Sequence, residues 1–335
     1  WFAAEFSEQV SIMLKLLVVP YFVALLHICG AAVAADVTDE RLHIVIPAGP
    51  GGGLDATARA IGRALVSDQE VARVSYENRT GGGGGKAMAY FVESNDSLRD
   101  TLLVNSTPLL IRSLQGLFPH SYKDLTPLAG LIADPGVIAV RADSPYQTWA
   151  DVVLAMKQKP GKLFVGGGSV KGSLDHIILS LLVDKVGIPP RSVRYLPYDG
   201  GGKAMLALLS GEVDILVSGL GETLSQQKAG SIVLLGMTAE QANPTFPQVP
   251  TFKAQQVDVV FYNWRGLFAP SSTEPEQRDQ WITQLSNTVA GEEWQLQLAR
   301  YGWQPLFLPG DEFVDYLSEQ EIMLKAVLLQ LGLVR

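Results

Sequence analysis

Short apolar runs alternate with stretches of helical periodicity along most of this chain. Between Asp55 and Val66, for example, apolar residues recur three and four positions apart, as they do on one face of a helix. The apolar runs predict strands at residues 42–47, 71–76, 101–104, 162–165, 193–196, 214–218, 233–237 and 264–269. The periodic segments predict helices at 55–66, 86–93, 109–117, 148–157 and 203–210. This alternation indicates an α/β fold with a largely parallel sheet.

Two segments depart from that alternation. Residues 128–140 contain two strand-like runs, which we expect Asp134, Pro135 and Gly136 to separate. The C-terminal part is expected to be mainly helical, at residues 274–292, 293–301 and 311–331. The folded chain, about 300 residues long, exceeds what one hydrophobic core usually serves, so two domains are expected.

Two glycine-rich turns have the same layout. At residues 45–65 and again at 165–182, an apolar run leads through glycines into a periodic helix. This arrangement directs free backbone N–H groups and the positive end of a helix dipole at an anion. Two such turns, far apart in the sequence, predict a binding protein that holds one anion between two lobes.

The residues around the first turn are the first candidate ligand contacts. Its glycines lack side chains, so backbone can approach a ligand closely, while Asp55 stands where a carboxylate caps a helix. The alternative is a plain turn with a plain cap. A polar triplet ends a nearby strand, at the edge where α/β sheets bind ligands. The candidates are Ala48, Gly49, Gly51, Gly52, Gly53, Asp55, Asn105, Ser106 and Thr107.

The second turn supplies a matching set. Hydroxyl groups flank its glycines and can cap the helix or donate to a carboxylate. A further glycine turn at 198–202 also follows a strand and precedes a helix. The candidates are Gly168, Ser169, Gly172, Ser173, His176, Asp199 and Gly200. His176 can equally be a packing residue, Gly81 to Gly85 can line the cleft or lie beneath it, and Arg265 can pair with a ligand or form a structural ion pair.

The first 35 residues read as upstream sequence and a signal peptide. Met13 opens a short basic region, residues 16–28 are apolar, and small residues follow up to Ala35. We therefore expect a secreted, periplasmic protein that begins near Ala35 or Asp36; an uncleaved anchor is the alternative. Cys29 is the only cysteine, so the secreted chain has no disulfide, cysteine zinc site or thiol nucleophile.

Charge and motifs argue against nucleic-acid binding and catalysis. The net charge is −8, and no basic cluster is present. Leu54 replaces the third glycine of a dinucleotide fingerprint, and Ala87 replaces the Ser or Thr of a P-loop. Around Ser169, Lys171 replaces the last glycine of a nucleophile elbow. We expect no catalytic residue, no metal ligands and no cofactor.

Six segments together resemble the tripartite tricarboxylate transporter substrate-receptor family, and more closely its tricarboxylate-receptor branch. In chain order they are PAGPGGGLDATAR, NRTGGGGGKAMAY, VGGGSVKGSLDH, YLPYDGGGKAMLALLSGEVD, PQVPTF and NWRGLFAP. They span the chain from about residue 42 to its C-terminus.

The resemblance implies a type II-like, two-lobed periplasmic binding protein, a Venus flytrap with two strand crossings between its lobes. Lobe 1 would comprise residues 37–139 and 263–335, and lobe 2 residues 140–262. A monomer would bind a di- or tricarboxylate between the lobes, with Ala48 to Asp55 on one side and Gly168 to Ser173 and Asp199 on the other. It would deliver the ligand to two integral membrane subunits. A periplasmic ligand sensor or an enzyme that reuses the fold is the alternative.

Overall fold

The computed structural model describes residues 41–334. The predicted signal peptide, including Cys29, and the first residues of the predicted lobe 1 lie outside the described residues. Among residues 41–334, no helix combines the length and the apolar character that crossing a bilayer requires.

Ten strands form one sheet in the described part of the chain. Its main order is β2-β1-β3-β9-β4-β7-β5-β6, and β10 and β8 also pair with β4. The strands are β1 (Arg41–Ile46), β2 (Arg73–Asn78), β3 (Thr101–Ser106), β4 (Leu125–Arg141), β5 (Phe164–Gly167), β6 (Arg194–Pro197), β7 (Ile215–Gly219), β8 (Ile232–Met237), β9 (Tyr262–Pro270) and β10 (Gln304–Pro309).

The sheet is mixed rather than largely parallel. β1 runs parallel to β2 and β3, and β5 runs parallel to β6 and β7. Between these groups, β4 and β9 pair antiparallel with each other and with their other neighbours. The parallel prediction therefore holds only toward the two ends of the sheet. The reason is that β4 and β9 are long strands that run through its centre instead of βαβ units.

Strand β4 also corrects a second expectation. It continues for 17 residues without a break at Asp134, Pro135 and Gly136. Two of these residues pair with β9, and Gly136 pairs with β7 and donates its N–H to Thr238 Oγ1 at 2.9 Å. An added Cβ at Gly136 would lie 2.7 Å from Ile178 Cδ1, so glycine serves close packing here instead of a turn.

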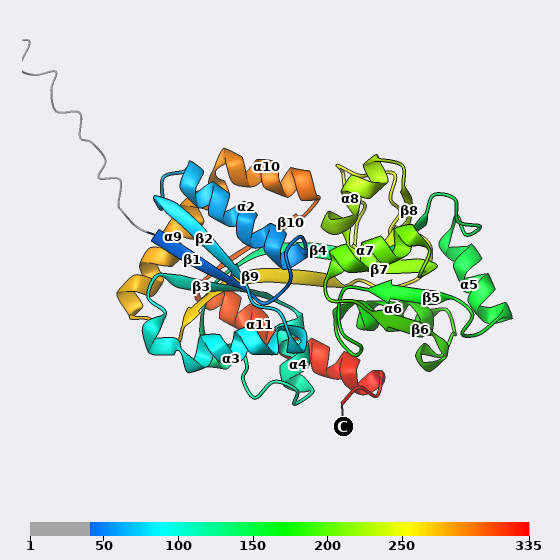
Figure 1. The fold of residues 1–335 in the computed structure, drawn as a ribbon, viewed down its shortest axis with the longest axis horizontal. Coiled ribbons are helices and arrows are strands. Elements are labelled where there is room, and N and C mark those ends of the chain that lie inside the picture. Colours follow the sequence, from blue (N-terminus) through cyan, green and yellow to red (C-terminus); the bar gives the residue numbers. More distant parts are fainter. Residues whose placement is uncertain (1–40, 335) are drawn as a thin grey trace, which may run out of the picture. The chain divides into compact units, whose positions relative to one another are not determined.

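Helices cover both faces of the sheet. They are α2 (Gly53–Ser67), α3 (Gly85–Glu93), α4 (Pro108–Leu114), α5 (Trp149–Gln158), α6 (Leu174–Lys185), α7 (Gly201–Ser210), α8 (Leu220–Lys228), α9 (Pro275–Ala290), α10 (Glu292–Tyr301) and α11 (Asp311–Gln330). Figure 1 shows α2 and α10 on one side of β1, β3 and β9, and α3 and α11 on the other. The sequence pattern did not indicate α8, nor β10, a Pro-containing strand inside the region expected to be helical.

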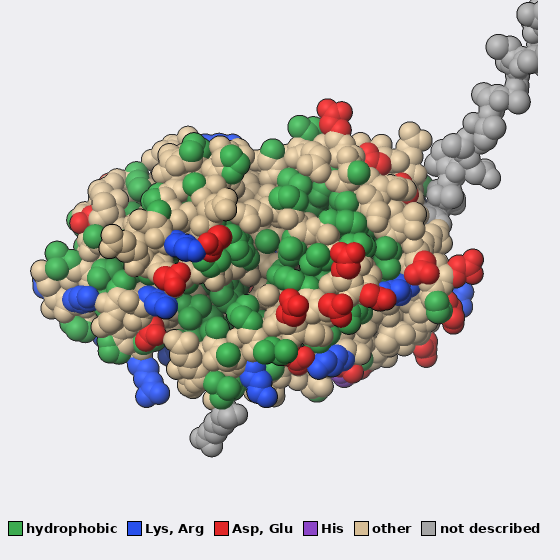
Figure 2. Space-filling model, turned by 180° about the vertical axis from the view of Figure 1, so that it is seen from behind, with side chains coloured by type: hydrophobic (Ala, Val, Ile, Leu, Met, Phe, Trp, Pro, Cys, Tyr) green, Lys and Arg blue, Asp and Glu red, His purple; other side chains and the backbone are tan. Residues whose placement is uncertain are grey.

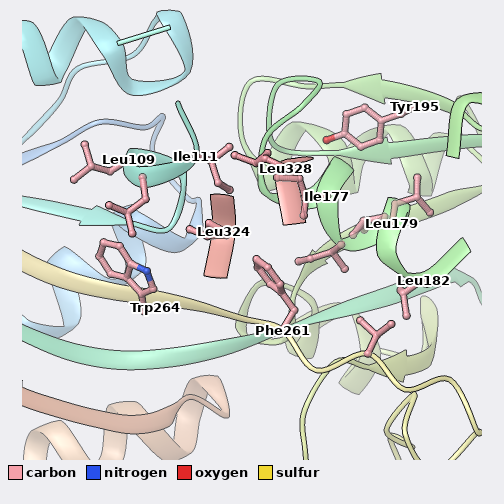
Figure 3. Packing of buried hydrophobic residues seen from close by; sticks show 14 of the residues in the cluster. Leu109, Ile111, Ile177, Leu179, Leu182, Tyr195, Phe261, Trp264, Leu324 and Leu328 are labelled. Atoms are coloured by element: carbon pink, nitrogen blue, oxygen red, sulfur yellow. The ribbon is translucent and has the colours of Figure 1, made fainter. Parts of the chain in front are cut away.

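The core reflects the alternation of side chains along a buried strand. On β1, Ile44 belongs to the cluster that contains Ile61 of α2, whereas Val45 belongs to the cluster on the opposite face. Helix α11 packs in the cluster that contains Val45. Figure 3 shows its Leu324 and Leu328 near Ile111 of α4, with Ile177 of α6 close to Leu328. This core therefore includes residues from both predicted lobes, and the lobe boundaries stay a prediction.

One face of the surface illustrates the charge distribution. In Figure 2, Lys and Arg side chains are scattered among Asp and Glu side chains. This agrees with the sequence, in which basic residues are dispersed and the net charge is −8.

Candidate functional site

The glycine turns meet around one small cavity. We call residues 48–53 the first turn, residues 168–173 the second turn and residues 198–201 the third turn. The cavity measures about 120 Å³, and all three turns contribute to its wall. Of the predicted site residues, the structure brings together Ala48, Gly52, Gly53, Ser106, Gly168, Ser169 and Gly200. The other side chains that line it include Asp134, Asp175, Ser218, Glu222, Asn263 and Arg265.

Glycine is required where the second and third turns touch. A Cβ at Gly168 would lie 2.4 Å from the backbone nitrogen of Gly201, a distance that no real side chain tolerates. The N–H of Gly200 also donates to the carbonyl of Gly168 at 3.1 Å. These contacts fix the start of α7 against the second turn, so both form one wall of the cavity.

Asp55 holds the first turn from behind. It is 5% exposed, and its carboxylate accepts hydrogen bonds from the N–H of Gly51 at 3.0 Å and from Asn78 Nδ2 at 3.1 Å. Burial opposes its charge, but bonds from Arg59, Gly51 and Asn78 outweigh burial and lower its pKa. Asp55 does not line the cavity. In the structure it lies within the first turn of α2 and holds the backbone of Gly51, and a contact of Asp55 with a ligand stays a prediction.

Asp175, at the start of α6 just after the second turn, is the counterpart of Asp55, and it does line the cavity. Its backbone N–H donates to the hydroxyl oxygen of Ser169 at 2.9 Å, which ties the start of α6 to the second turn. Burial, with a contribution from nearby Glu222, raises its pKa to about 7. The sequence reasoning missed Asp175, although Leu54-Asp55 and Leu174-Asp175 open the two helices with the same dipeptide.

Arg265 forms a buried ion pair. Its Nη2 lies 2.7 Å from Asp134 Oδ2, and its Nη1 donates to Thr57 Oγ1 at 3.2 Å. Burial raises the pKa of Asp134 to about 6, even though Arg265 opposes this shift. Of the two roles considered from the sequence, the structure shows the structural ion pair.

Two buried polar atoms in the cavity wall lack a hydrogen-bond partner among the described residues. They are Nε of Arg265, a donor, and Oδ1 of Asn263, an acceptor. Both side chains are more than nine-tenths buried. Because buried polar groups are nearly always satisfied, these two side chains make the cavity a candidate place for a polar ligand.

Glu222, from α8, faces the start of α2. Its Oε1 accepts the N–H of Gly53 at 2.6 Å, and its Oε2 accepts the Ser218 hydroxyl at 2.7 Å. The sequence offered no signal for this contact, which joins residues 169 positions apart.

The remaining predicted site residues lie outside the cavity wall. They are Gly49, Gly51, Asn105, Thr107, Gly172, Ser173, His176 and Asp199. Asn105 accepts the N–H of Ser106, and His176 Nδ1 accepts the N–H of Gly172 at 3.3 Å, so both organise backbone. Burial lowers the pKa of His176, which packs edge-on against Tyr195. Asp199 is exposed, and its Oδ2 lies 3.5 Å from Nζ of Lys203.

The run Gly81 to Gly85 is also absent from the cavity wall. A Cβ at Gly84 would meet Pro47 at 3.5 Å, and one at Gly85 would meet Phe118 at 2.9 Å. This run is a 3₁₀ turn that leads into α3 and packs against Pro47 and Phe118, and a Cβ at Gly83 would also lie 3.3 Å from Val170 of the second turn.

A larger hollow of about 770 Å³ lies elsewhere, between the segment around Asn95 and the start of α9. Its wall contains Asp96, Asp100, Glu274 and Glu276. None of the glycine turns contributes to it. We therefore place the candidate site at the smaller cavity, where backbone donors and unpartnered buried atoms coincide.

The raised pKa of Asp175 predicts a pH dependence of stability. Its folded-state pKa of about 7 lies above the value of 3.8 for an unperturbed aspartate, so between these values the folded protein binds more protons than the unfolded chain. The free energy of unfolding should therefore fall as pH rises from 4 to 8, by up to about 4 kcal/mol from this group. Urea denaturation at pH 5 and pH 8 measures the change, which Asp175→Asn should reduce. Equal pH dependence in the variant and the wild type would contradict the assignment.

Comparison with protein families and curated proteins identifies relatives of the chain. The family model "Tripartite tricarboxylate transporter family receptor" matches residues 63–333. The UPF0065 protein in the tcbD-tcbE intergenic region of a Pseudomonas species is 28% identical over 250 residues, covering 73% of each chain.

Solved structures share the fold. The periplasmic binding protein BugD superposes with a TM-score of 0.80 at 21% identity, covering 88% of this chain and 98% of that one. MatC from Rhodopseudomonas palustris, solved with bound malate, superposes with a TM-score of 0.74 at 21% identity, covering 86% of this chain and 98% of that one. An R. palustris protein solved with adipate superposes with a TM-score of 0.80 at 21% identity, covering 87% of this chain and 97% of that one. The architecture is the α/β periplasmic binding protein fold.

Proposed function

Because this chain belongs to the tripartite tricarboxylate transporter receptor family, we propose that it is a periplasmic receptor for a di- or tricarboxylate. The ligand binds in the cavity between the glycine turns, and the receptor delivers it to the integral membrane subunits of a tripartite transporter. The observation that carries this proposal is that the starts of α2 and α7 both form the wall of one cavity.

Helix starts explain how an acidic chain can bind an acid. Their N–H groups and dipoles attract a carboxylate without any cationic side chain. Within the wall, Arg265 compensates the charge of Asp134, and burial raises the pKa of Asp175 to about 7, which lowers the negative charge that opposes an anion. The two relatives solved with malate and adipate bind small dicarboxylates, which fits this chemistry.

The mechanism we propose is closure of two lobes around the ligand. Lobe 1 comprises residues up to 139 and from 263 onward, and lobe 2 comprises residues 140–262. With these bounds the chain passes between the lobes at the end of β4 and at the start of β9, and these are the natural hinges. Binding would then bring the first turn toward the second and third turns. A binding role without catalysis accords with a family and fold of periplasmic binding proteins, which are not enzymes.

Thermal denaturation with a panel of carboxylates tests the proposal. A ligand at one hundred times its Kd stabilises the folded protein by about 2.7 kcal/mol, so a true ligand should raise Tm clearly. Malate, adipate and citrate are suitable probes, with the corresponding methyl esters as neutral controls. Esters that raise Tm as much as the acids, or a panel without any shift, would contradict carboxylate recognition.

A further inference from the structure

The carboxylate of Glu222 lies where an anion at the start of α2 would lie. Its Oε1 accepts the N–H of Gly53, the first residue of α2, at 2.6 Å. The distance is short, as expected for a hydrogen bond to a charged acceptor. The side chain reaches this position from the first turn of α8.

The same carboxylate also lies against the start of α7. A Cβ built on Gly201, the first residue of α7, would be 2.7 Å from both Oε1 and Oε2 of Glu222. The carboxylate therefore lies against the starts of α2 and α7, and it also accepts the N–H of Gly219, the N-cap residue of its own helix α8, at 3.5 Å. The position against the starts of α2 and α7 is the one that the proposed function assigns to a carboxylate of the ligand.

We propose that Glu222 is an internal competitor, whose carboxylate occupies the position of a ligand carboxylate and leaves when the ligand binds. This inference rests on the proposed function. The N–H of Gly53 cannot make a second strong bond while Glu222 accepts it, and two carboxylates there would repel each other. The small cavity agrees with this, since 120 Å³ is well below the roughly 300–1,000 Å³ of ordinary ligand pockets.

A place for the displaced side chain exists beside the cavity. Glu222 also lines a neighbouring hollow of about 260 Å³. The guanidinium-bearing side chains of Arg59 and Arg63 contribute to the wall of that hollow. Arg59 is paired there with Asp55, which also lines the hollow, and Arg63 Nε lies 3.9 Å from Glu293 Oε1. A rotation of Glu222 would move its charge away from Asp134 and Asp175 and into a wall that contains these two arginines and Asp55.

Three variants test this competition by calorimetric titration with malate, adipate and citrate. Glu222→Gln removes the charge and keeps the shape, whereas Glu222→Asp keeps the charge and shortens the side chain out of reach of Gly53. Both should bind at least about tenfold more tightly than the wild type, the effect expected from losing a charge-assisted hydrogen bond. Glu319→Gln, which removes an exposed charge on α11, should bind as the wild type does.

The outcomes separate competition from other roles of Glu222. Unchanged or weaker binding in Glu222→Gln would overturn the proposal, because it would make Glu222 neutral or a ligand contact. Tighter binding in Glu222→Gln with wild-type binding in Glu222→Asp would also overturn it, in favour of a general charge effect.

A second measurement does not depend on ligand. Without any carboxylate, hydrogen exchange of the Gly53 amide should be faster in Glu222→Asp than in the wild type, by about tenfold. Equal exchange would overturn the contact itself. If the panel binds to neither protein but the amide exchange differs, the proposed function fails while the occupation of this position by Glu222 stands.

Discussion

Replacing Arg265 with glutamine should destabilise the fold by about 3–5 kcal/mol at pH 8, the usual effect of breaking a buried ion pair. Asp134 is fully buried, and Arg265 Nη2 is 2.7 Å from its carboxylate. Without the guanidinium, the carboxylate must stay charged in a low dielectric or take up a proton at high pH. Urea denaturation measures the loss.

The double variant Asp134→Asn with Arg265→Gln is the matched control. It removes both charges and leaves two amides that can still hydrogen bond, so it should lose less than half as much stability as Arg265→Gln alone. A double variant as unstable as the single one would show that shape, not charge compensation, determines this part of the fold.

Gly168→Ala should abolish carboxylate binding, with a loss of at least about a hundredfold in affinity. The added Cβ would lie 2.4 Å from the backbone nitrogen of Gly201. Because backbone cannot move aside as a flexible side chain can, the second and third turns must separate. The wall of the cavity then changes shape. Calorimetric titration with a carboxylate from the panel measures the effect.

Gly202→Ala is the control for Gly168→Ala. Gly202 follows Gly201 in α7, and a Cβ at Gly202 would have no atom of another part of the chain within 4 Å. Alanine also has a higher helix propensity than glycine, so this variant should bind normally and be slightly more stable. Equal loss of binding in both variants would contradict the close contact between the turns as the cause.

The glycine turns could be predicted because their signal is local. An apolar run, glycines and a helix start lie within about 20 residues of each other, and the structure brings three such turns to one cavity. The sequence could not distinguish the glycines from one another. Gly52 and Gly168 looked alike, yet a Cβ at Gly52 would reach only ordinary contact, 3.6 Å from Glu222.

Asp134 and Glu222 could not be predicted as cavity residues, because their positions depend on pairing over long distances. Asp134 meets Arg265 only because β4 and β9 pair antiparallel, with two register shifts along the ladder. Glu222 meets Gly53 only because α8 and α2 begin on opposite sides of the cavity. Asp134 and Pro135 suggested a turn in the sequence. In the structure Arg265 compensates the charge of the buried Asp134 carboxylate, and strand β4 continues through both residues.

A crystal structure of the protein with the tightest-binding carboxylate of the panel tests the central claim most directly. We expect a ligand carboxylate within hydrogen-bond distance of the N–H groups at the starts of α2 and α7, with Glu222 turned away from Gly53. A carboxylate bound instead in the larger hollow beside α9, with the cavity between the glycine turns unchanged, would contradict the account.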